Sequence, residues 1–183
     1  MTEILWHGRG GQGAFTAAKF FGASYALSSD NFALSFPSFG PERRGAPILA
    51  FTKLDKKPIG NRSQIKKADY VVFLDDSLLS PSSFAEVKKN GTILINSSQS
   101  KEAFLSASSE QNINIITFDG SAMAKEILGL NVANTAMAAL LAKISGIVSE
   151  EELINSLKIY MSEKVAEKNA FLIRAVFENG GNK

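Results

Sequence analysis

Residues 4–18 read ILWHGRGGQGAFTAA: an apolar run gives way to a glycine-rich turn, and the turn opens a stretch of small residues typical of a helix. Gly8, Gly10 and Gly13 fall at G-x-G-x-x-G spacing. Glycine permits a tight turn and lets a phosphate approach the backbone without a Cβ in the way. The first N–H groups of the new helix have no acceptors within the helix, and they carry the positive end of its dipole. The stretch therefore predicts a strand–turn–helix unit that can cradle an anion.

A second interpretation of the same glycines is structural, because they would also let the helix lie close to the sheet. A classical NAD site requires Asp or Glu about twenty residues further on, at the end of the second strand. Here the second strand is expected near residues 31–35 and runs into FPSFG; Asp30 precedes it, and the next acid is Glu42. The missing acid disfavours NAD, while the anion cradle and the structural role both stay open.

Length and charge bound the class of protein. A chain of 183 residues is long enough for one α/β domain with a sound core, and too short for two of ordinary size. The net charge of the chain is only +2, and its basic residues look scattered along the sequence. This favours neither nucleic acid nor an anionic membrane as a partner. Glu3 and His7 interrupt any apolar leader, and the apolar stretch 133–144 is too short to span a bilayer. We therefore expect a cytoplasmic protein.

The sequence contains no cysteine and a single histidine, His7. The chain therefore cannot supply a disulfide, a catalytic thiol, or the thiolates of an iron–sulfur cluster or a zinc site. A metal site built on histidines is also disfavoured. Any redox metal chemistry must then be carried out by another chain.

Strand signals alternate with helix signals over the first two thirds of the chain, and the remainder is helical. This alternation predicts a mostly parallel sheet with helices on both faces, in one Rossmann-like α/β domain that spans residues 1–183. Ser149 and Glu152 form a capping-box pattern before one of the last helices. The expected strands are residues 3–7, 32–35, 48–54, 70–74, 92–95 and 113–118, and the expected helices are 14–27, 63–68, 81–89, 122–128, 133–144, 150–160 and 163–177.

A second unusual stretch is GPERRGAP, residues 40–47, preceded by Phe36 and Phe39. Two prolines and two glycines in eight residues make a stiff, defined loop. In one interpretation the loop is a binding surface, in which Arg43 and Arg44 grip a carboxylate or phosphate and the phenylalanines anchor a partner. In the other, the phenylalanines belong to the core and the arginines are solvated.

Asp75, Asp76 and Asp119 follow expected strands, so they should lie at the carboxyl edge of the sheet, where ligands bind in open α/β folds. Adjacent carboxylates diverge in direction, and Asp before Ser is a common helix cap, so we favour turn and capping roles over catalysis. His7 ends the first strand beside the glycine turn. No nucleophile elbow accompanies it, which favours a structural hydrogen bond over general-base catalysis.

The stretch WHGRGGQGA (residues 6–14), taken with FPSFGPERRGAP (residues 36–47), closely resembles the gamma subunit of 2-oxoacid:ferredoxin oxidoreductases. The expected strand 70–74 and the helix that begins near Asn134 also fit, so the resemblance covers nearly the whole chain. The full GPERRGAP run is most similar to the pyruvate branch of this family.

The resemblance implies a subunit of an enzyme complex, with alpha, beta and delta chains as partners and ferredoxin as the electron acceptor. It implies that thiamine diphosphate and the iron–sulfur clusters belong to the sister chains, that no catalytic residue lies here, and that the chain has no activity alone. Coenzyme A is the cofactor whose phosphates would suit the glycine turn and nearby arginines. The alternatives are a noncatalytic structural or gating subunit and a free-standing nucleotide-binding oxidoreductase. The candidate cofactor-binding residues are Gly8, Arg9, Gly10, Gly11, Gln12, Gly13, Arg43 and Arg44.

Overall fold

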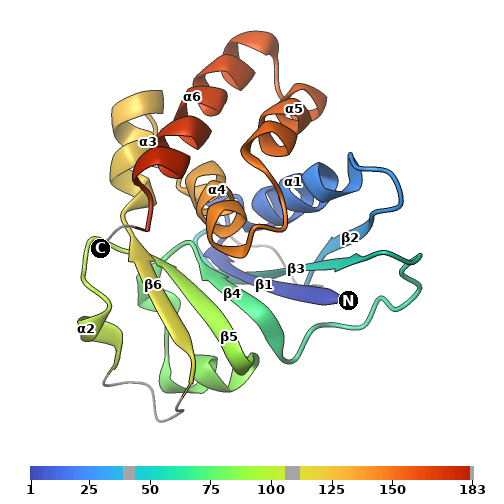
Figure 1. The fold of residues 1–183 in the computed structure, drawn as a ribbon. Coiled ribbons are helices and arrows are strands. Elements are labelled where there is room, and N and C mark those ends of the chain that lie inside the picture. The colour runs from blue at the N-terminus through green and yellow to red at the C-terminus, as the bar shows by residue number, and fades with distance from the viewer. Residues whose placement is uncertain (39–43, 106–111, 182–183) are drawn as a thin grey trace.

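In the computed structural model the described residues are 1–38, 44–105 and 112–181, and they form a six-stranded sheet of order β2-β3-β1-β4-β5-β6 (Figure 1). On one side of β1, the strands β4, β5 and β6 all lie parallel to it. On the other side β3 is antiparallel to β1, and β2 is antiparallel to β3. Five of the six strands therefore share one direction, which confirms the mostly parallel sheet. The strands are β1 (Thr2–Arg9), β2 (Phe32–Pro37), β3 (Pro47–Asp55), β4 (Ala68–Phe73), β5 (Val87–Asn96) and β6 (Asn114–Phe118).

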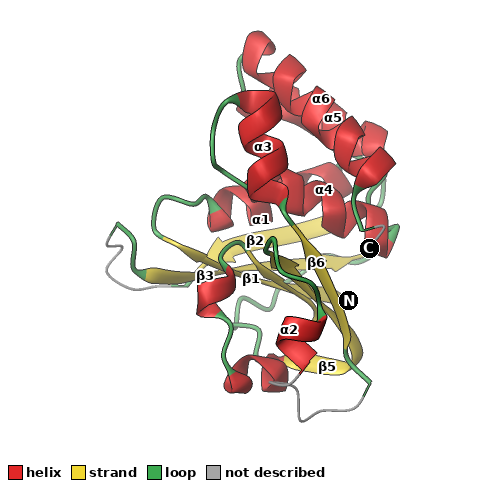
Figure 2. Ribbon diagram, turned by 90° about the vertical axis from the view of Figure 1, so that its left-hand side faces the viewer, coloured by secondary structure: helices red, strands yellow, loops and turns green. Residues whose placement is uncertain are grey.

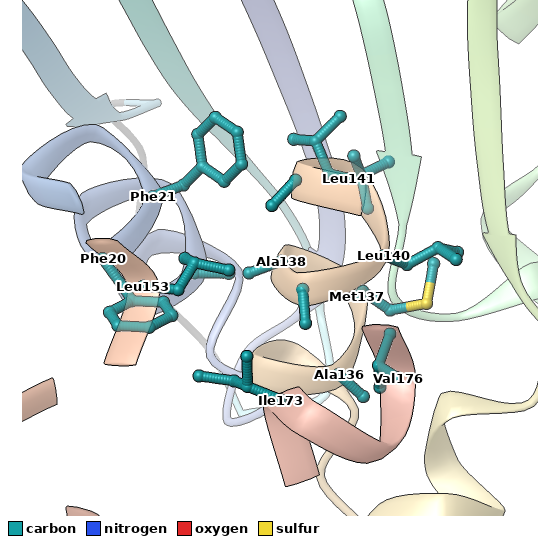
Figure 3. Close-up of a cluster of buried hydrophobic side chains, with 14 of the residues drawn as sticks. Phe20, Phe21, Ala136, Met137, Ala138, Leu140, Leu141, Leu153, Ile173 and Val176 are labelled. Carbon is teal, nitrogen blue, oxygen red and sulfur yellow. The ribbon is translucent and has the colours of Figure 1, made fainter. Parts of the chain in front are cut away.

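The long helices gather on one face of the sheet, above it in Figure 1. Side chains alternate across a strand, so Ile4 and Trp6 of β1 point into this helical layer while Leu5 points to the opposite face. The centre of the layer is α4, in which eight residues are buried; Figure 3 shows it packed between Phe21 of α1 and Val176 of α6. The helices are α1 (Ala14–Ala26), α3 (Gly120–Leu128), α4 (Asn134–Ser145), α5 (Glu150–Tyr160) and α6 (Glu163–Asn179).

Within the described residues the opposite face carries only short helical pieces, so the helices expected on both faces are unevenly distributed (Figure 2). These pieces are the 3-10 segments η1 (Asp76–Leu78) and η2 (Pro81–Glu86) and the helix α2 (Glu102–Leu105). Phe84 and Phe104 from these pieces join a second apolar cluster with Phe73 of β4. This face is therefore covered by apolar side chains from connections and short helical pieces, Ile65 among them.

Two expected helices are wrong. Residues 63–67 form no helix, and the helix expected over 81–89 is a 3-10 segment that ends at Glu86, after which β5 begins. The pair Asn90-Gly91, which directly follows the expected helix, lies in a register shift between β4 and β5, where Asn90 has φ +63°. Asn and Gly suit such a β-bulge as well as a helix end, because both tolerate unusual backbone angles.

Two consecutive buried hydrogen bonds fix α1 to the sheet. The Trp6 indole N–H donates to Thr52 Oγ1 at 3.1 Å, and the Thr52 hydroxyl donates to the Ala18 carbonyl of α1 at 3.0 Å. Trp6 and Thr52 are both fully buried, so each polar atom is satisfied inside the core. The link sets the position of α1, and with it the glycine turn that precedes the helix.

The helix ends match the sequence patterns. Ser149 and Glu152 form the expected capping box at the start of α5, and Asp119 caps α3 by accepting the Ala122 N–H at 2.8 Å. No helix in the described residues is long and apolar enough to cross a membrane.

Replacing Gly91 with Ala should destabilise the fold. The new Cβ would lie 2.7 Å from Val87 Cγ1, 2.8 Å from the Asp69 carbonyl oxygen and 2.9 Å from that of Lys88. We expect the free energy of unfolding in urea to fall by about 1–3 kcal/mol. Gly60→Ala is the matched control, because a Cβ there meets nothing within 4 Å. Equal midpoints for the two variants would contradict the crowding at Gly91.

Candidate functional site

The glycine turn joins β1 to α1, as the sequence predicts, and a second segment braces it. Gly10 donates its N–H to the Ala46 carbonyl at 2.9 Å and accepts the Gly45 N–H at 3.0 Å. Gly10 and Arg44 thus form an isolated bridge between segments that are far apart in the sequence. The two motifs singled out in the sequence therefore meet at one point, the carboxyl end of β1.

The glycines of the turn are required for different reasons. A Cβ on Gly8 would lie 3.0 Å from the Ala14 Cβ, so Gly8 lets the strand approach the helix. Gly11 and Gly13 have φ +98° and +78°, backbone angles that residues with a side chain rarely adopt. A Cβ on Gly13 would also lie 2.5 Å from Asn134 Nδ2 of α4, whereas a Cβ on Gly11 would meet nothing within 4 Å. Gly8 and Gly13 therefore serve packing, while Gly11 faces open space.

The turn offers fewer free N–H groups than the sequence suggests. The N–H of Gly10 is bonded to Ala46, and that of Gln12 is bonded to the Arg9 carbonyl at 2.9 Å. Among the described residues no acceptor bonds the N–H of Gly11 or Gly13, and α1 begins with neither a side-chain cap nor an acidic residue in its first turn. The positive end of α1 is thus uncompensated by these residues, which is the condition for anion binding at a helix start.

Two candidate residues, Arg9 and Gln12, are engaged in holding the turn. Arg9 Nε and Gln12 Nε2 both donate to Asp75 Oδ2, at 3.0 and 2.9 Å. The Arg9 guanidinium also donates to Ser77 Oγ at 2.9 Å and to the Gly45 carbonyl at 3.2 Å. Arg9 therefore ties together β1, the segment after β4 and the segment that precedes β3. Its fixed contacts leave the backbone of the turn as the surface that faces outward.

The charge of Asp75 is stabilised by the same contacts. Burial alone would raise the pKa of Asp75, but hydrogen bonds from Ser77, Gln12 and Arg9 outweigh burial and hold the pKa below the usual range of an aspartate. A lowered folded-state pKa stabilises the fold above the unfolded pKa and loses that contribution as the pH falls through the folded value. The anchoring of the turn is therefore intact at neutral pH.

Only part of the GPERRGAP loop lies in the described residues. Arg43 and Phe39 lie outside them, so the structure does not place those two predicted contacts. Arg44 is exposed beside Gly10, which leaves its side chain available next to the glycine turn. Phe36 stacks on Phe51 with ring centroids 5.1 Å apart, as the core interpretation of that residue expects.

The three predicted aspartates do lie at the carboxyl edge of the sheet, around a crevice of about 260 Å³ that Gln12 and Asn96 also line. Asp75 holds the glycine turn, Asp76 accepts the Ser97 hydroxyl at 2.6 Å, and Asp119 caps α3. Each carboxylate therefore has the structural role that the sequence favoured. The described residues contain no group of three or more His, Cys, Asp or Glu side chains placed to hold a metal.

His7 also has a structural environment. Its Nε2 lies 2.7 Å from Glu86 Oε2, and its ring stacks on Phe73 with centroids 4.2 Å apart. These contacts tie η2 to the end of β1, in agreement with the structural interpretation of His7.

Two asparagines are important here that local sequence reasoning does not identify. Asn96 donates to the Leu74 carbonyl at 3.0 Å and to Ser121 Oγ at 2.8 Å, which joins β4, β5 and α3 at the crevice. Asn134 packs against Gly13, so the start of α4 lies next to the start of α1. For Asn134 the family resemblance was the only signal, and for Asn96 its place at the end of a buried strand was the available one.

Known proteins share the sequence and the fold of this chain. The family model for pyruvate ferredoxin/flavodoxin oxidoreductase matches residues 3–179. The pyruvate/ketoisovalerate oxidoreductases common subunit gamma of Pyrococcus abyssi is 41% identical over 97% of this chain and 96% of its own length. The crystal structure of pyruvate oxidoreductase subunit PORC from Thermotoga maritima superposes with a TM-score of 0.84 at 28% identity, over 97% of this chain and 96% of that one.

A more distant structure shares the fold. In 2-oxoglutarate:ferredoxin oxidoreductase from Magnetococcus marinus, solved with 2-oxoglutarate, coenzyme A and succinyl-CoA, 31% of the chain superposes on 97% of this one, with a TM-score of 0.76 at 16% identity. The fold described here thus also occurs as one part of a longer chain. Since the family model spans residues 3–179 and close relatives match over almost their full length, this chain belongs to the pyruvate ferredoxin/flavodoxin oxidoreductase family.

Proposed function

We propose that the chain is the gamma subunit of a 2-oxoacid:ferredoxin oxidoreductase complex, with pyruvate as the favoured 2-oxoacid. The observation that carries the proposal is the match at 41% identity, over 97% of the chain, to a protein named as a gamma subunit. Such a complex converts a 2-oxoacid to an acyl-CoA with loss of CO2 and reduction of ferredoxin. The proposed partners are alpha, beta and delta chains in the cytoplasm.

The redox centres are assigned to the partner chains. Iron–sulfur clusters in proteins are held chiefly by cysteine thiolates, and this sequence has no cysteine. The residues at the carboxyl edge that could take part in acid–base chemistry, Asp75, Asp76 and Asp119, are engaged in structural hydrogen bonds. In this proposal the chain binds a cofactor and completes the site of its partners.

Coenzyme A is the cofactor that suits the glycine turn. Its thiol accepts the acyl group in the reaction, and its phosphates are the anions that a helix N-terminus attracts. Three features support the assignment: the open space above Gly11, the unbonded N–H groups of Gly11 and Gly13 among the described residues, and the exposed Arg44 beside Gly10. In this proposal Gly11, Gly13 and the first turn of α1 hold phosphate oxygens, and Arg44 and Arg43 add positive charge.

The topology argues against the free-standing nucleotide-binding oxidoreductase. In a dinucleotide site the strand that follows the first helix lies next to β1 and supplies an acid for the ribose. Here the antiparallel β3 lies between β1 and β2, and β2 contains no acidic residue. The purely structural or gating subunit stays as the second candidate, because it requires the same fold and partners without cofactor contact.

The isolated chain should have no oxidoreductase activity. Pyruvate- and coenzyme A-dependent reduction of viologen should be absent for the pure chain and should appear on mixing with the sister subunits. Turnover by the pure chain would contradict the assignment as a subunit.

The phosphate cradle is tested at Thr16, an exposed residue in the first turn of α1. Thr16→Glu places a carboxylate where a phosphate would bind, and an acid at this position favours the helix, so stability should be kept or slightly raised. We expect the affinity of the reconstituted complex for coenzyme A, measured by calorimetry, to fall about tenfold, as a like-charge repulsion of about 1.4 kcal/mol requires.

Thr16→Gln is the matched control, because glutamine has nearly the same size as glutamate and carries no charge. It should bind coenzyme A within about twofold of the parent complex. If Thr16→Glu assembles, melts normally and binds coenzyme A unchanged, the cradle is removed from the mechanism and the structural role is retained.

A further inference from the structure

The connection between β3 and β4 concentrates positive charge. Residues 56–67, KKPIGNRSQIKK, contain five Lys or Arg, no acidic residue and no aromatic residue. The rest of the chain holds 15 Lys and Arg against 18 Asp and Glu, so the net positive charge of the protein comes from this segment. The expectation that the basic residues are scattered along the chain is therefore wrong for residues 56–67. Loops of this length without helix or strand are uncommon in compact domains and are often functional.

Residues 56–67 contain neither helix nor strand, but buried side chains fix the position of the segment against the sheet. Lys53 of β3 is 1% exposed, and its Nζ donates to the Asn61 carbonyl at 3.2 Å. Ile65 is buried in the apolar cluster beneath the sheet. Burying an ammonium group costs free energy, and here its hydrogen bond fixes the course of the loop. The loop is therefore a defined surface that the core supports.

The positive side chains of the segment point outward and are available. Lys57, Arg62, Lys66 and Lys67 are exposed, and within the described part of the chain none of the four forms an ion pair. The carboxylates that flank the segment are engaged elsewhere. Asp55 pairs with the N-terminal ammonium at 3.4 Å, and Asp69 pairs with Lys88 at 2.9 Å.

The segment also lies apart from the glycine turn. Thr2 pairs with Leu54, so β3 ends beside the start of β1, and β4 begins at the same edge of the sheet. The glycine turn is at the other edge, where β1 ends. Figure 1 shows the teal connection leaving the right-hand end of β3 and passing close to the N-terminus. A macromolecule bound to residues 56–67 would therefore leave the turn open.

We propose that residues 56–67 are a docking surface for a carboxylate-rich face of another protein chain in the same complex. Charge complementarity commits the surface to an acidic partner. The absence of aromatic residues from the segment leaves no platform for stacking bases. Its two isoleucines are buried or half-buried, so it offers no apolar face for a membrane. The inference rests on the proposed function only for the existence of the complex.

Lysine footprinting of the purified complex tests this surface. Acetylation by a water-soluble N-hydroxysuccinimide ester is compared between the complex and the isolated chain by mass spectrometry. We expect Lys57, Lys66 and Lys67 to react at least tenfold more slowly in the complex, while the exposed helical lysines Lys125 and Lys164 change less than twofold. Equal reactivity of the loop lysines in an assembled complex overturns the inference and leaves the proposed function standing.

The source of any protection is then identified. Protection that survives nuclease treatment supports a protein partner, whereas protection lost on that treatment assigns the surface to nucleic acid and overturns the inference. Protection that appears in the isolated chain at high concentration assigns it to a second copy of this chain, and overturns it equally.

A pair of charge-matched variants provides the second measurement. One variant replaces Lys57, Arg62, Lys66 and Lys67 with Gln; the control replaces four exposed helical lysines, Lys125, Lys158, Lys164 and Lys168, with Gln. Both should melt close to the parent chain. We expect the loop variant alone to dissociate from the complex at a salt concentration at least twofold lower. Equal salt sensitivity of the two variants would show that only net charge matters, and would overturn the inference.

Discussion

The hydrogen bonds that Arg9 and Gln12 donate to Asp75 are the constraint on which the site depends. Asp75 stands at the carboxyl end of β4, and both donors stand at the glycine turn, so one carboxylate fixes the turn to the neighbouring strand. Because the Arg9 guanidinium also reaches the Gly45 carbonyl, the second motif is held in the same arrangement. A turn fixed by its own side chains does not require a ligand to order it, and preorganisation of this kind lowers the cost of binding.

The glycines within the turn have different roles. Packing requires glycine at positions 8 and 13, since a Cβ on Gly8 would crowd Ala14 and a Cβ on Gly13 would crowd Asn134. Gly11 has a positive φ but faces open space, and its N–H has no acceptor among the described residues. The structure thus gives Gly8 and Gly13 a packing role, and the anion-binding role that we propose requires only the N–H groups of Gly11 and Gly13. This is why Thr16, rather than a glycine, is the informative place to test binding.

Much of the fold follows from local sequence patterns. The strand–turn–helix unit, the buried α4 and the caps at Ser149 and Asp119 depend on residues adjacent in the chain, so the sequence predicts them. The insertion of β3 between β1 and β2 is a long-range pairing that no local pattern encodes. The bulge at Asn90 was not predicted for a different reason: the pair Asn90-Gly91 also suits a helix end, so the local pattern is ambiguous. At the site, the positions of the aspartates were predictable from the strand ends, whereas the partners of Asp75 required the fold.

Amide NMR of the 15N-labelled chain, titrated with coenzyme A, tests whether the backbone of the glycine turn binds phosphate. The N–H resonances of Gly11 and Gly13 should shift on titration. Those of Gly129 and Gly146, which also have positive φ but cap α3 and α4 through their own hydrogen bonds, should stay unchanged. Gly10, already bonded to Ala46, should shift little. Unchanged Gly11 and Gly13 resonances at millimolar coenzyme A would show that the turn does not bind the cofactor.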